Sequence, residues 1–162
     1  MTIAYLALGS NIGDRLENLQ RAVQLLQDHE AIEIEAKSKI YQTESVEGGG
    51  ETNFLNAALR VRTLLSAVEL LEAVRNIEET LGRPQPPRTG SRLIDIDILS
   101  FGDVRMESAV LTLPHPRMHY RAFVLKPLLD VLEGGWVEVT NLGWDRGIGL
   151  FNVVGVSYEL RQ

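Results

Sequence analysis

The spacing of hydrophobic residues changes several times along the chain. Residues 2–9 are mostly apolar and end in a glycine, which is typical of a short buried strand. Asp14 and Glu17 have the spacing of a helix cap, and the apolar residues after them predict a helix: Leu16, Leu19, Val23 and Leu26. Alternation then predicts a half-buried strand, whose apolar face consists of Ile32, Ile34, Ala36 and Ile40.

A strand, a helix and another strand are predicted next. From residue 54, alternation places Leu55, Ala57, Leu59 and Val61 on one face and Phe54, Asn56, Ala58, Arg60 and Arg62 on the other. Ser66 and Glu69 have the spacing of a capping box, so a helix should begin there and end at Gly82. Its expected inner face is Val68, Leu71, Val74 and Leu81. Residues 93–101 should form the following strand.

The order strand, helix, strand, strand, helix, strand predicts an α+β fold of the split βαβ, or ferredoxin-like, type. Its antiparallel sheet would carry both helices on one face and leave the other face for a site. Weaker patterns predict a short strand at 110–113 and a helix at 120–131 that Pro127 should break or kink. Residues 1–162 are expected to form one domain, in which segment 134–162 has no assigned place, although strands could lie at 136–139 and 150–158.

Composition narrows the classes of function. The 162 residues include no cysteine, which excludes disulfides, thiolate metal sites and cysteine nucleophiles. A formal net charge of -6 argues against nucleic acid or an acidic membrane surface as a partner, because binding to either draws on clustered cations. The N-terminus lacks the pattern of a secretory signal, and no apolar run has the length of a membrane span. We expect a cytoplasmic protein that binds small molecules, and nothing in the sequence demands more than a monomer.

The strand predicted at 93–101 carries a pair of carboxylates. Alternation puts Ile94, Ile96 and Ile98 on one face and Asp95 and Asp97 on the other. Two carboxylates so placed repel each other unless a cation lies between them, and hard oxygen ligands suit Mg²⁺. A solvated strand face is the commoner explanation of an isolated Asp-x-Asp, but strands disfavour aspartate, which favours the metal site.

Cationic residues occur on both sides of this strand. A proline-rich loop at 83–92 contains Arg83, Arg88 and Arg92, and residues 113–123 contain His115, Arg117, His119 and Arg121. Each of these residues alone is explained by a solvated loop. Together, next to a carboxylate pair, they suit a polyphosphate whose transfer requires positive charge.

Two further positions suit a planar ligand. Phe54 and Asn56 share the face that points away from the apolar side of their strand, so a ring could stack there while an amide reads its edge. The turn Gly9-Ser10-Asn11 is explained equally well by local geometry and by contact with a ligand.

Six segments, taken together, form a specific set. They are Ala7-Leu8-Gly9-Ser10-Asn11, Tyr41-Gln42-Thr43-Glu44, Phe54-Leu55-Asn56-Ala57, Ile77-Glu78 with Leu81-Gly82-Arg83, Arg92-Leu93-Ile94-Asp95-Ile96-Asp97-Ile98-Leu99, and Leu113-Pro114-His115-Pro116 with Arg121-Ala122-Phe123-Val124-Leu125. In this order they resemble the 6-hydroxymethyl-7,8-dihydropterin pyrophosphokinase family of folate synthesis. The resemblance runs from Thr2 to about Asp130, and the family is described as ferredoxin-like, in agreement with the order of elements.

The resemblance implies a reaction and a set of site residues. ATP and a pterin alcohol would bind side by side, and the pyrophosphoryl group would pass to the alcohol with release of AMP. Two Mg²⁺ ions on Asp95 and Asp97 would bridge the ATP phosphates. The implied catalytic residues are Arg83, Arg92, Asp95 and Asp97. Contacts to ATP are implied for Glu78, Arg83, Arg92, Ile98, Thr112, His115 and Arg121. Contacts to the pterin are implied for Thr43, Val46, Phe54, Asn56, Asp95 and Phe123, with the two phenylalanines enclosing the ring.

Three positions depart from the family pattern. Many relatives carry tryptophan where this chain has Thr89, and Gly-Pro where it has Gly90-Ser91. Some carry an arginine where it has Val110. The first two changes affect a loop that is expected to close over the site together with loop 46–53, and the third removes one expected phosphate contact.

Two other functions agree with parts of the sequence. Nucleotidyltransferases also use Gly-Ser and Asp-x-Asp, but there the two motifs lie close together, whereas here they lie at 9–10 and 95–97. Release of pyrophosphate instead of AMP would identify that class. A non-catalytic module for RNA or a small ligand would leave the carboxylates unexplained, and 6% aromatic residues with a negative net charge argue against RNA.

Overall fold

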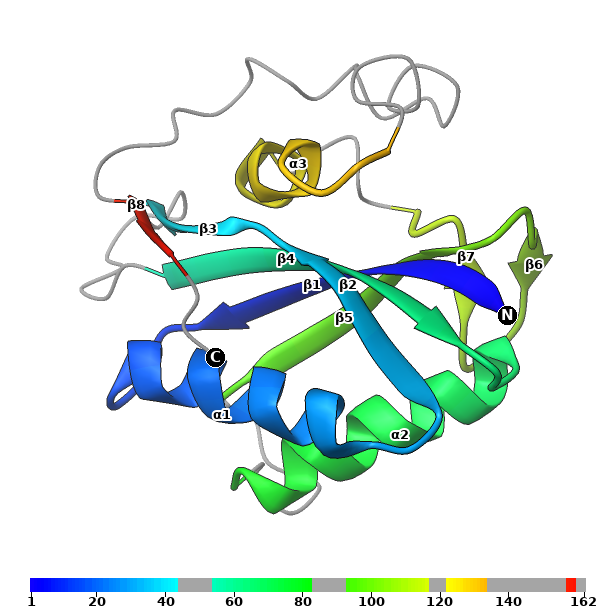
Figure 1. Ribbon diagram of the computed structural model, residues 1–162, viewed down its shortest axis with the longest axis horizontal. Helices are drawn as coiled ribbons and strands as arrows, with labels where there is room; N and C mark the ends of the chain where they lie inside the picture. The colour runs from blue at the N-terminus through cyan, green and yellow to red at the C-terminus, as the bar shows by residue number, and fades with distance from the viewer. Residues whose placement is uncertain (44–53, 83–92, 117–121, 134–156, 160–162) are drawn as a thin grey trace.

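The computed structural model describes residues 1–43, 54–82, 93–116, 122–133 and 157–159 (Figure 1). Their helices and strands are, in chain order, β1 (Thr2–Ser10), α1 (Arg15–Asp28), β2 (Ile32–Lys37), β3 (Lys39–Thr43), β4 (Phe54–Thr63), α2 (Ala67–Thr80), β5 (Asp95–Phe101), β6 (Met106–Glu107), β7 (Thr112–Leu113), α3 (Ala122–Leu129) and β8 (Ser157–Glu159).

Both long helices begin where the sequence indicated. The Asp14 side chain accepts a hydrogen bond from the backbone N–H of Glu17 at the start of α1. Ser66 and Glu69 form a reciprocal capping box at the start of α2. Gly82, just beyond α2, has a φ of 108°, a left-handed conformation that glycine adopts without strain.

The main sheet has the strand order β5-β1-β4-β3-β8, and β2 also pairs with β4. Every pairing in it is antiparallel. β2 and β3 occupy successive parts of the long strand β4, with Ile32 opposite Thr63 and Thr43 opposite Phe54. This arrangement, with β1 and β4 in the centre, confirms the predicted ferredoxin-like α+β fold.

The single strand predicted at residues 32–40 is in fact two strands. Ser38 separates them: its N–H donates to the carbonyl of Ala58, and its hydroxyl accepts from the N–H of Ala58. The register also shifts between Ile34 and Ala36. Such a bulge reverses the face on which the following side chains lie, so Ala36 packs on the face opposite to Ile32.

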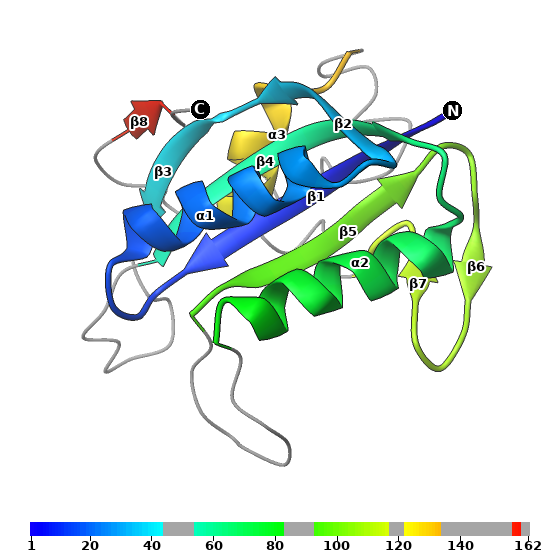
Figure 2. The ribbon, with the colours of Figure 1, turned by 60° about the horizontal axis from the view of Figure 1, so that its bottom comes forward.

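α1 and α2 lie side by side along one face of the sheet, where the main hydrophobic core forms (Figure 2). The inner face of α2 is rotated from the predicted one. Val68 is 42% exposed, and the buried apolar residues of the helix are Ala67, Leu70, Ala73, Val74 and Ile77. The helix itself was predicted correctly, because its capping residues fix where it begins.

The opposite face is only partly open, because α3 covers a portion of it (Figure 1). A second hydrophobic cluster forms there between the sheet and the helix: Tyr5, Ala7, Ala58, Leu99, Val124, Leu128, Val131 and Leu132. α3 continues through Pro127 and ends two residues later, at Leu129. The remaining part of this face lies towards the end of β1 and the starts of β4 and β5.

Two short elements complete the fold. β6 and β7 form a small hairpin that was not predicted, and the strand expected at 110–113 is confined to Thr112–Leu113 because Val110 is exposed. β8 extends the sheet beyond β3 and falls at the end of the strand suggested at 150–158. The rest of the strand suggested at 150–158, and the strand suggested at 136–139, fall outside the described residues.

Candidate active site

Asp95 and Asp97 lie on one face of β5, as alternation predicts. Both are half-buried, whereas Ile94, Ile96 and Ile98 are buried in the main core. The two carboxylates therefore share the face that lies away from α1 and α2. Within the described ranges, no group of three or more histidine, aspartate or glutamate side chains is placed to hold a metal ion. A cation at this pair would need further oxygen ligands from a substrate or from water.

A row of paired residues crosses the sheet beside the first carboxylate. Asp95 lies opposite Gly9, Gly9 lies opposite Asn56, and Asn56 lies opposite Tyr41. Residues paired in this way point to the same face of a sheet, about 5 Å apart. The register thus places the carboxylate of β5 and the amide of β4 on one face, with a glycine between them.

The residues of β1 along this row are small, and the Asn56 amide lies close against Gly9. A β-carbon on Gly9 would lie 3.0 Å from Oδ1 of Asn56 and 3.9 Å from Cδ1 of Phe54. Ala7, the next residue of β1 on this face, lies opposite Asp97. Asn56 is buried and Phe54 is half-buried. The aromatic ring and the amide therefore border a stretch of β1 that has almost no side chains of its own.

Glu78 reaches β5 from α2 and is almost completely buried. Its Oε2 accepts a 3.0 Å hydrogen bond from the backbone N–H of Ile96, the residue between the two aspartates. Nη1 of Arg75 lies 3.7 Å from the other carboxylate oxygen. This predicted nucleotide residue thus lies against the backbone of β5 between the two aspartates, and one of its oxygens is engaged there.

Three other predicted nucleotide residues belong to β5 and the segment that follows it. The Ile98 side chain is buried in the core, so a contact with a ligand would have to use its backbone. The backbone N–H of His115 donates to the carbonyl of Leu99 at 2.9 Å. His115 and Thr112 are half-buried. The hydrogen bond attaches the His115 segment to β5 two residues beyond Asp97.

The other predicted site residues lie wholly or partly outside the described residues. Arg83, Arg92, Arg121 and Val46 fall in segments that are not described, as do Thr89 and Ser91. Thr43 and Phe123 are placed by their backbone alone: Thr43 ends β3 opposite Phe54, and Phe123 is the second residue of α3.

Tyr41 and Asp130 form a contact that sequence reasoning missed. The Tyr41 hydroxyl donates to Oδ2 of Asp130 at 2.7 Å, and the same oxygen accepts from the backbone N–H of Lys39 at 3.1 Å. Burial, together with this carboxylate, raises the pKa of Tyr41 to about 12. Because Tyr41 lies opposite Asn56, the contact attaches the end of α3 to the strand beside the site. Tyr41 belongs to one of the six family segments, but no local pattern singled out Asp130.

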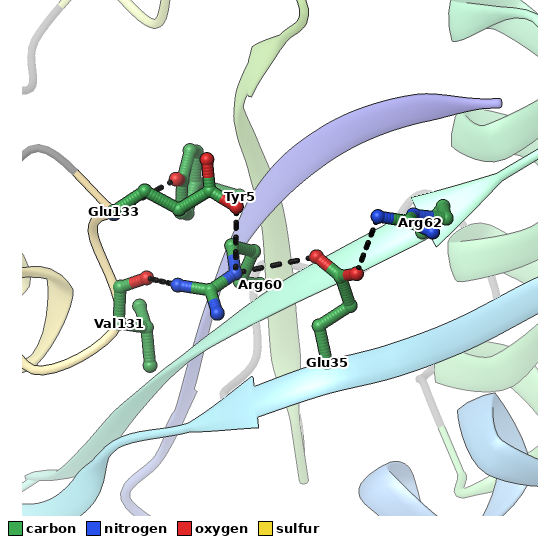
Figure 3. Close-up of polar contacts among 6 residues, drawn as sticks. All are labelled: Tyr5, Glu35, Arg60, Arg62, Val131 and Glu133. Atoms are coloured by element: carbon green, nitrogen blue, oxygen red, sulfur yellow. Dashed lines mark hydrogen bonds and ion pairs between the residues drawn. The ribbon is translucent and has the colours of Figure 1, made fainter.

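Further polar contacts hold the same end of α3 to the sheet (Figure 3). Arg60 donates a hydrogen bond to the carbonyl of Val131 and lies 3.3 Å from Oε1 of Glu35. The Tyr5 hydroxyl accepts from the backbone N–H of Glu133 at 3.3 Å. These contacts attach the residues after α3 to β1 and β4, and so help to set where the helix lies on the sheet.

The fold and the site define the class of protein as an α+β sandwich whose sheet presents two carboxylates, an aromatic ring and an amide on one face. Solved structures share its fold. An HPPK-DHPS of Plasmodium falciparum with pteroate matches with a TM-score of 0.64, 15% sequence identity, and coverage of 96% of this chain and 47% of that one. An HPPK-DHPS in complex with substrates matches with a TM-score of 0.62, 15% identity, and coverage of 81% and 42%.

Sequence comparison gives the family. The sequence model of the family 7,8-dihydro-6-hydroxymethylpterin-pyrophosphokinase (HPPK) matches residues 5–133 of this chain. A 2-amino-4-hydroxy-6-hydroxymethyldihydropteridine pyrophosphokinase of Bacillus subtilis is 44% identical over 144 residues, which are 89% of this chain and 86% of that protein. The bifunctional protein FolKE of Lactococcus lactis subsp. lactis is 41% identical over 133 residues, 82% of this chain but 38% of that protein. The chain belongs to the HPPK family.

Proposed function

We propose that this protein transfers the pyrophosphoryl group of ATP to 6-hydroxymethyl-7,8-dihydropterin and releases AMP, in the synthesis of folate. The proposal rests above all on the row that crosses the sheet, in which Asp95, Gly9 and Asn56 share one face. It places groups suited to a metal–phosphate complex next to groups suited to a pterin. The family assignment and the names of the relatives support the same reaction.

Asp95 and Asp97 fit Mg²⁺. They offer two hard carboxylate donors on one face, and the residues of β1 paired with them, Gly9 and Ala7, carry no side chain that would compete as a ligand. Mg²⁺ is usually held by one or two carboxylates together with substrate phosphates, which agrees with a pair of acidic residues and no third one nearby among the described residues. We assign both aspartates to two Mg²⁺ ions that, when bound with ATP, supply charge neutralisation on the transferred group.

The pterin is assigned to the Asn56 side of the row. A buried carboxamide offers both donors and an acceptor, which suits the edge of a pterin ring, and Phe54 offers a stacking face beside it. Phe123 is assigned to the other face of the ring, and Thr43 and Val46 to contacts through their backbone. The Asp95 carboxylate, opposite Gly9, would lie between this ligand and the phosphates.

ATP is assigned to the outer side of β5, which ends the sheet among the described residues, and to the cationic segments that flank the strand in sequence. Glu78, Thr112 and His115 lie along or next to that strand. The backbone of Ile98 is the remaining group of the strand assigned to the nucleotide. Three arginines are assigned to the phosphates, Arg83, Arg92 and Arg121, because a guanidinium binds phosphate oxygens in a bidentate manner.

The chemistry requires no covalent intermediate with the protein. The hydroxyl oxygen of the pterin alcohol bonds to the β-phosphorus, and its proton is released to water. The bond from that phosphorus to the oxygen shared with the α-phosphorus breaks, so AMP leaves with that oxygen. Asn56 and Phe54 orient the alcohol, and the arginines bind the charge of the moving group. Holding two reactants in line in this way accounts for a large part of the rate in such reactions.

The setting of the reaction follows from its substrates. We expect a single-domain monomer that acts on small molecules in the cytoplasm, with no nucleic-acid or membrane partner. The helices that the structure describes include none that is long and apolar enough to cross a membrane.

The decisive test is the formation of AMP from ATP and Mg²⁺, with and without 6-hydroxymethyl-7,8-dihydropterin. AMP that appears only with the pterin, and not in the presence of EDTA, supports the proposed reaction. Pyrophosphate in place of AMP would identify a nucleotidyltransferase. Binding of both ligands without any AMP would contradict the proposal and direct attention to Thr89 and Ser91.

A further inference from the structure

The carbonyl group of Leu93 is the centre of a buried hydrogen-bond network next to the proposed site. The Ser10 hydroxyl donates to this carbonyl at 2.6 Å, and Nδ2 of Asn18 lies 3.2 Å from it. The same amide nitrogen lies 3.1 Å from Oγ of Ser10 and 2.9 Å from the carbonyl of Ile12. Ser10 and Asn18 are both buried. The network therefore joins the end of β1, the first turns of α1 and the residue that precedes β5.

The side chain of Leu93 lies at a second junction. A β-carbon on Gly82 would lie 3.0 Å from Cδ1 of Leu93, and one on Gly13 would lie 3.9 Å from Cδ2. Both glycines have a positive φ. Leu93 thus touches the turn before α1 and the end of α2, and the residues on either side of segment 83–92, Gly82 and Leu93, lie against each other.

The position of Leu93 in the chain gives this junction its significance. It comes two residues before Asp95 and directly after Arg92, both assigned to the site. Ser10 likewise follows Gly9, which lies opposite Asp95 in the sheet. Neither the Ser10 hydroxyl nor the Asn18 amide is required to form the turn between β1 and α1. A turn does not need two buried donors on a carbonyl group from a distant part of the chain.

We propose that Ser10 and Asn18 are positioning residues, which hold the Leu93 carbonyl and thereby set where Asp95 stands relative to β1. This inference rests on the proposed function of Asp95 and extends it to two residues that touch no substrate. Displacement of a reacting group by about 1 Å can cost about a hundredfold in rate, so loss of this anchor is expected to reduce turnover.

The chain offers a closely matched control at the other end of the sheet. The Thr63 hydroxyl donates to the carbonyl of Ala31 at 2.6 Å and accepts from the N–H of Leu65 at 3.0 Å. Like Ser10, Thr63 is 1% exposed. It lies opposite Thr2, at the far end of β1 from Ser10. Removing either hydroxyl deletes one donated and one accepted bond, but only Ser10 is next to the proposed site.

The experiment compares Ser10→Ala, Asn18→Ala and the double variant with Thr63→Val, in the full chain. Steady-state AMP formation gives kcat, the KM for the pterin alcohol and the Mg²⁺ concentration at half-maximal rate, and urea unfolding gives stability. We expect Ser10→Ala to lower kcat by about tenfold to a hundredfold and to raise the Mg²⁺ requirement, with little change in the pterin KM. Thr63→Val should lose similar stability and keep its kcat. The double variant should lose less kcat than the product of the two single losses, because both residues act on one carbonyl.

Equal kcat values for Ser10→Ala and Thr63→Val at matched loss of stability would overturn the inference, since the network would then be purely structural. If Ser10→Ala does not fold, Asn18→Ala is compared with Thr63→Val in the same way. Failure of the proposed function is a different result, because the unmodified protein would then form no pterin-dependent AMP at all.

Discussion

The carboxamide oxygen of Asn56 fills the space beside Gly9 that a side chain there would need. The two residues are paired between β1 and β4, and a β-carbon on Gly9 would come within 3.0 Å of Oδ1 of Asn56. That separation is closer than carbon and oxygen tolerate without a shift of one of them. The conformation of Asn56 therefore depends on the residue opposite.

Gly9→Ala should weaken binding of the pterin alcohol by roughly tenfold, equivalent to about 1.4 kcal/mol, because the methyl group displaces the Asn56 amide. Isothermal titration with the pterin measures this, and thermal unfolding shows whether the fold is retained. In an Asn56→Ala background the added methyl group should have almost no further effect on binding. A full tenfold loss in that background would show that Gly9 acts in some other way.

Asp97→Ala should lower the rate of AMP formation by about a hundredfold or more, because several kcal/mol of charge stabilisation by the metal would be lost. Asp97 is half-buried and is not part of the main core, so the variant should unfold at nearly the same temperature. Asp103→Ala, at an exposed position just after the same strand, is the control and should keep normal activity. Normal turnover by Asp97→Ala would refute the metal assignment.

Glu78→Ala should destabilise the fold by about 1–3 kcal/mol, because the buried N–H of Ile96 loses its acceptor. Glu78→Gln keeps an oxygen of similar reach, so its loss of stability should be smaller. Urea unfolding of both variants tests this. The KM for ATP then separates a ligand contact from a structural one: an unchanged KM in Glu78→Gln would argue against direct contact of the carboxylate with the nucleotide.

Tyr41 should make stability depend on pH in the alkaline range. Its pKa is raised from 10.0 to about 12 in the folded protein, first by burial and then by Asp130. A group whose pKa is higher in the folded than in the unfolded protein contributes its full stabilisation at pH values below the unfolded-state pKa. That contribution is lost as pH rises towards the pKa of the folded state. The protein should therefore lose more stability between about pH 10 and 12 than Tyr41→Phe does. The Asp130→Asn variant should still differ in part from Tyr41→Phe, because burial raises the pKa of Tyr41 more than Asp130 does. Identical pH profiles for the protein and Tyr41→Phe would contradict the assignment.

Local signals predicted much of the framework. Asp14 and the Ser66–Glu69 pair fix where two helices begin, since a cap acts on N–H groups within three residues. Alternation placed Phe54 and Asn56 on one face and the isoleucines of β5 on the other, as a strand requires. The six segments led to the family because each carries residues whose types are constrained by one site.

Contacts between distant segments could not be predicted in the same way. Alternation from Ile32 to Ile40 is interrupted only at Ser38, and the pairing of Ser38 with Ala58 shows why two strands form there. The anchoring of α3 by Asp130 and the bonds of Asn18 to Leu93 connect residues far apart in the chain, with no local pattern to mark them. The row that joins Asp95 to Asn56 depends on the register of three strands, which no single strand encodes.

β5 is the outer strand of the main sheet among the described residues, and this position has a consequence beyond catalysis. An edge strand exposes backbone groups that invite another chain to pair with it, and an apolar strand such as this one is prone to do so. Here the carboxylate of Glu78 occupies the N–H of Ile96, and the N–H of His115 occupies the carbonyl of Leu99. Two of the backbone groups that such pairing would use are therefore already bonded to residues assigned to the nucleotide. Selection for solubility and selection for substrate binding would then act on the same side chain of Glu78, and a variant that alters one property should be checked for the other.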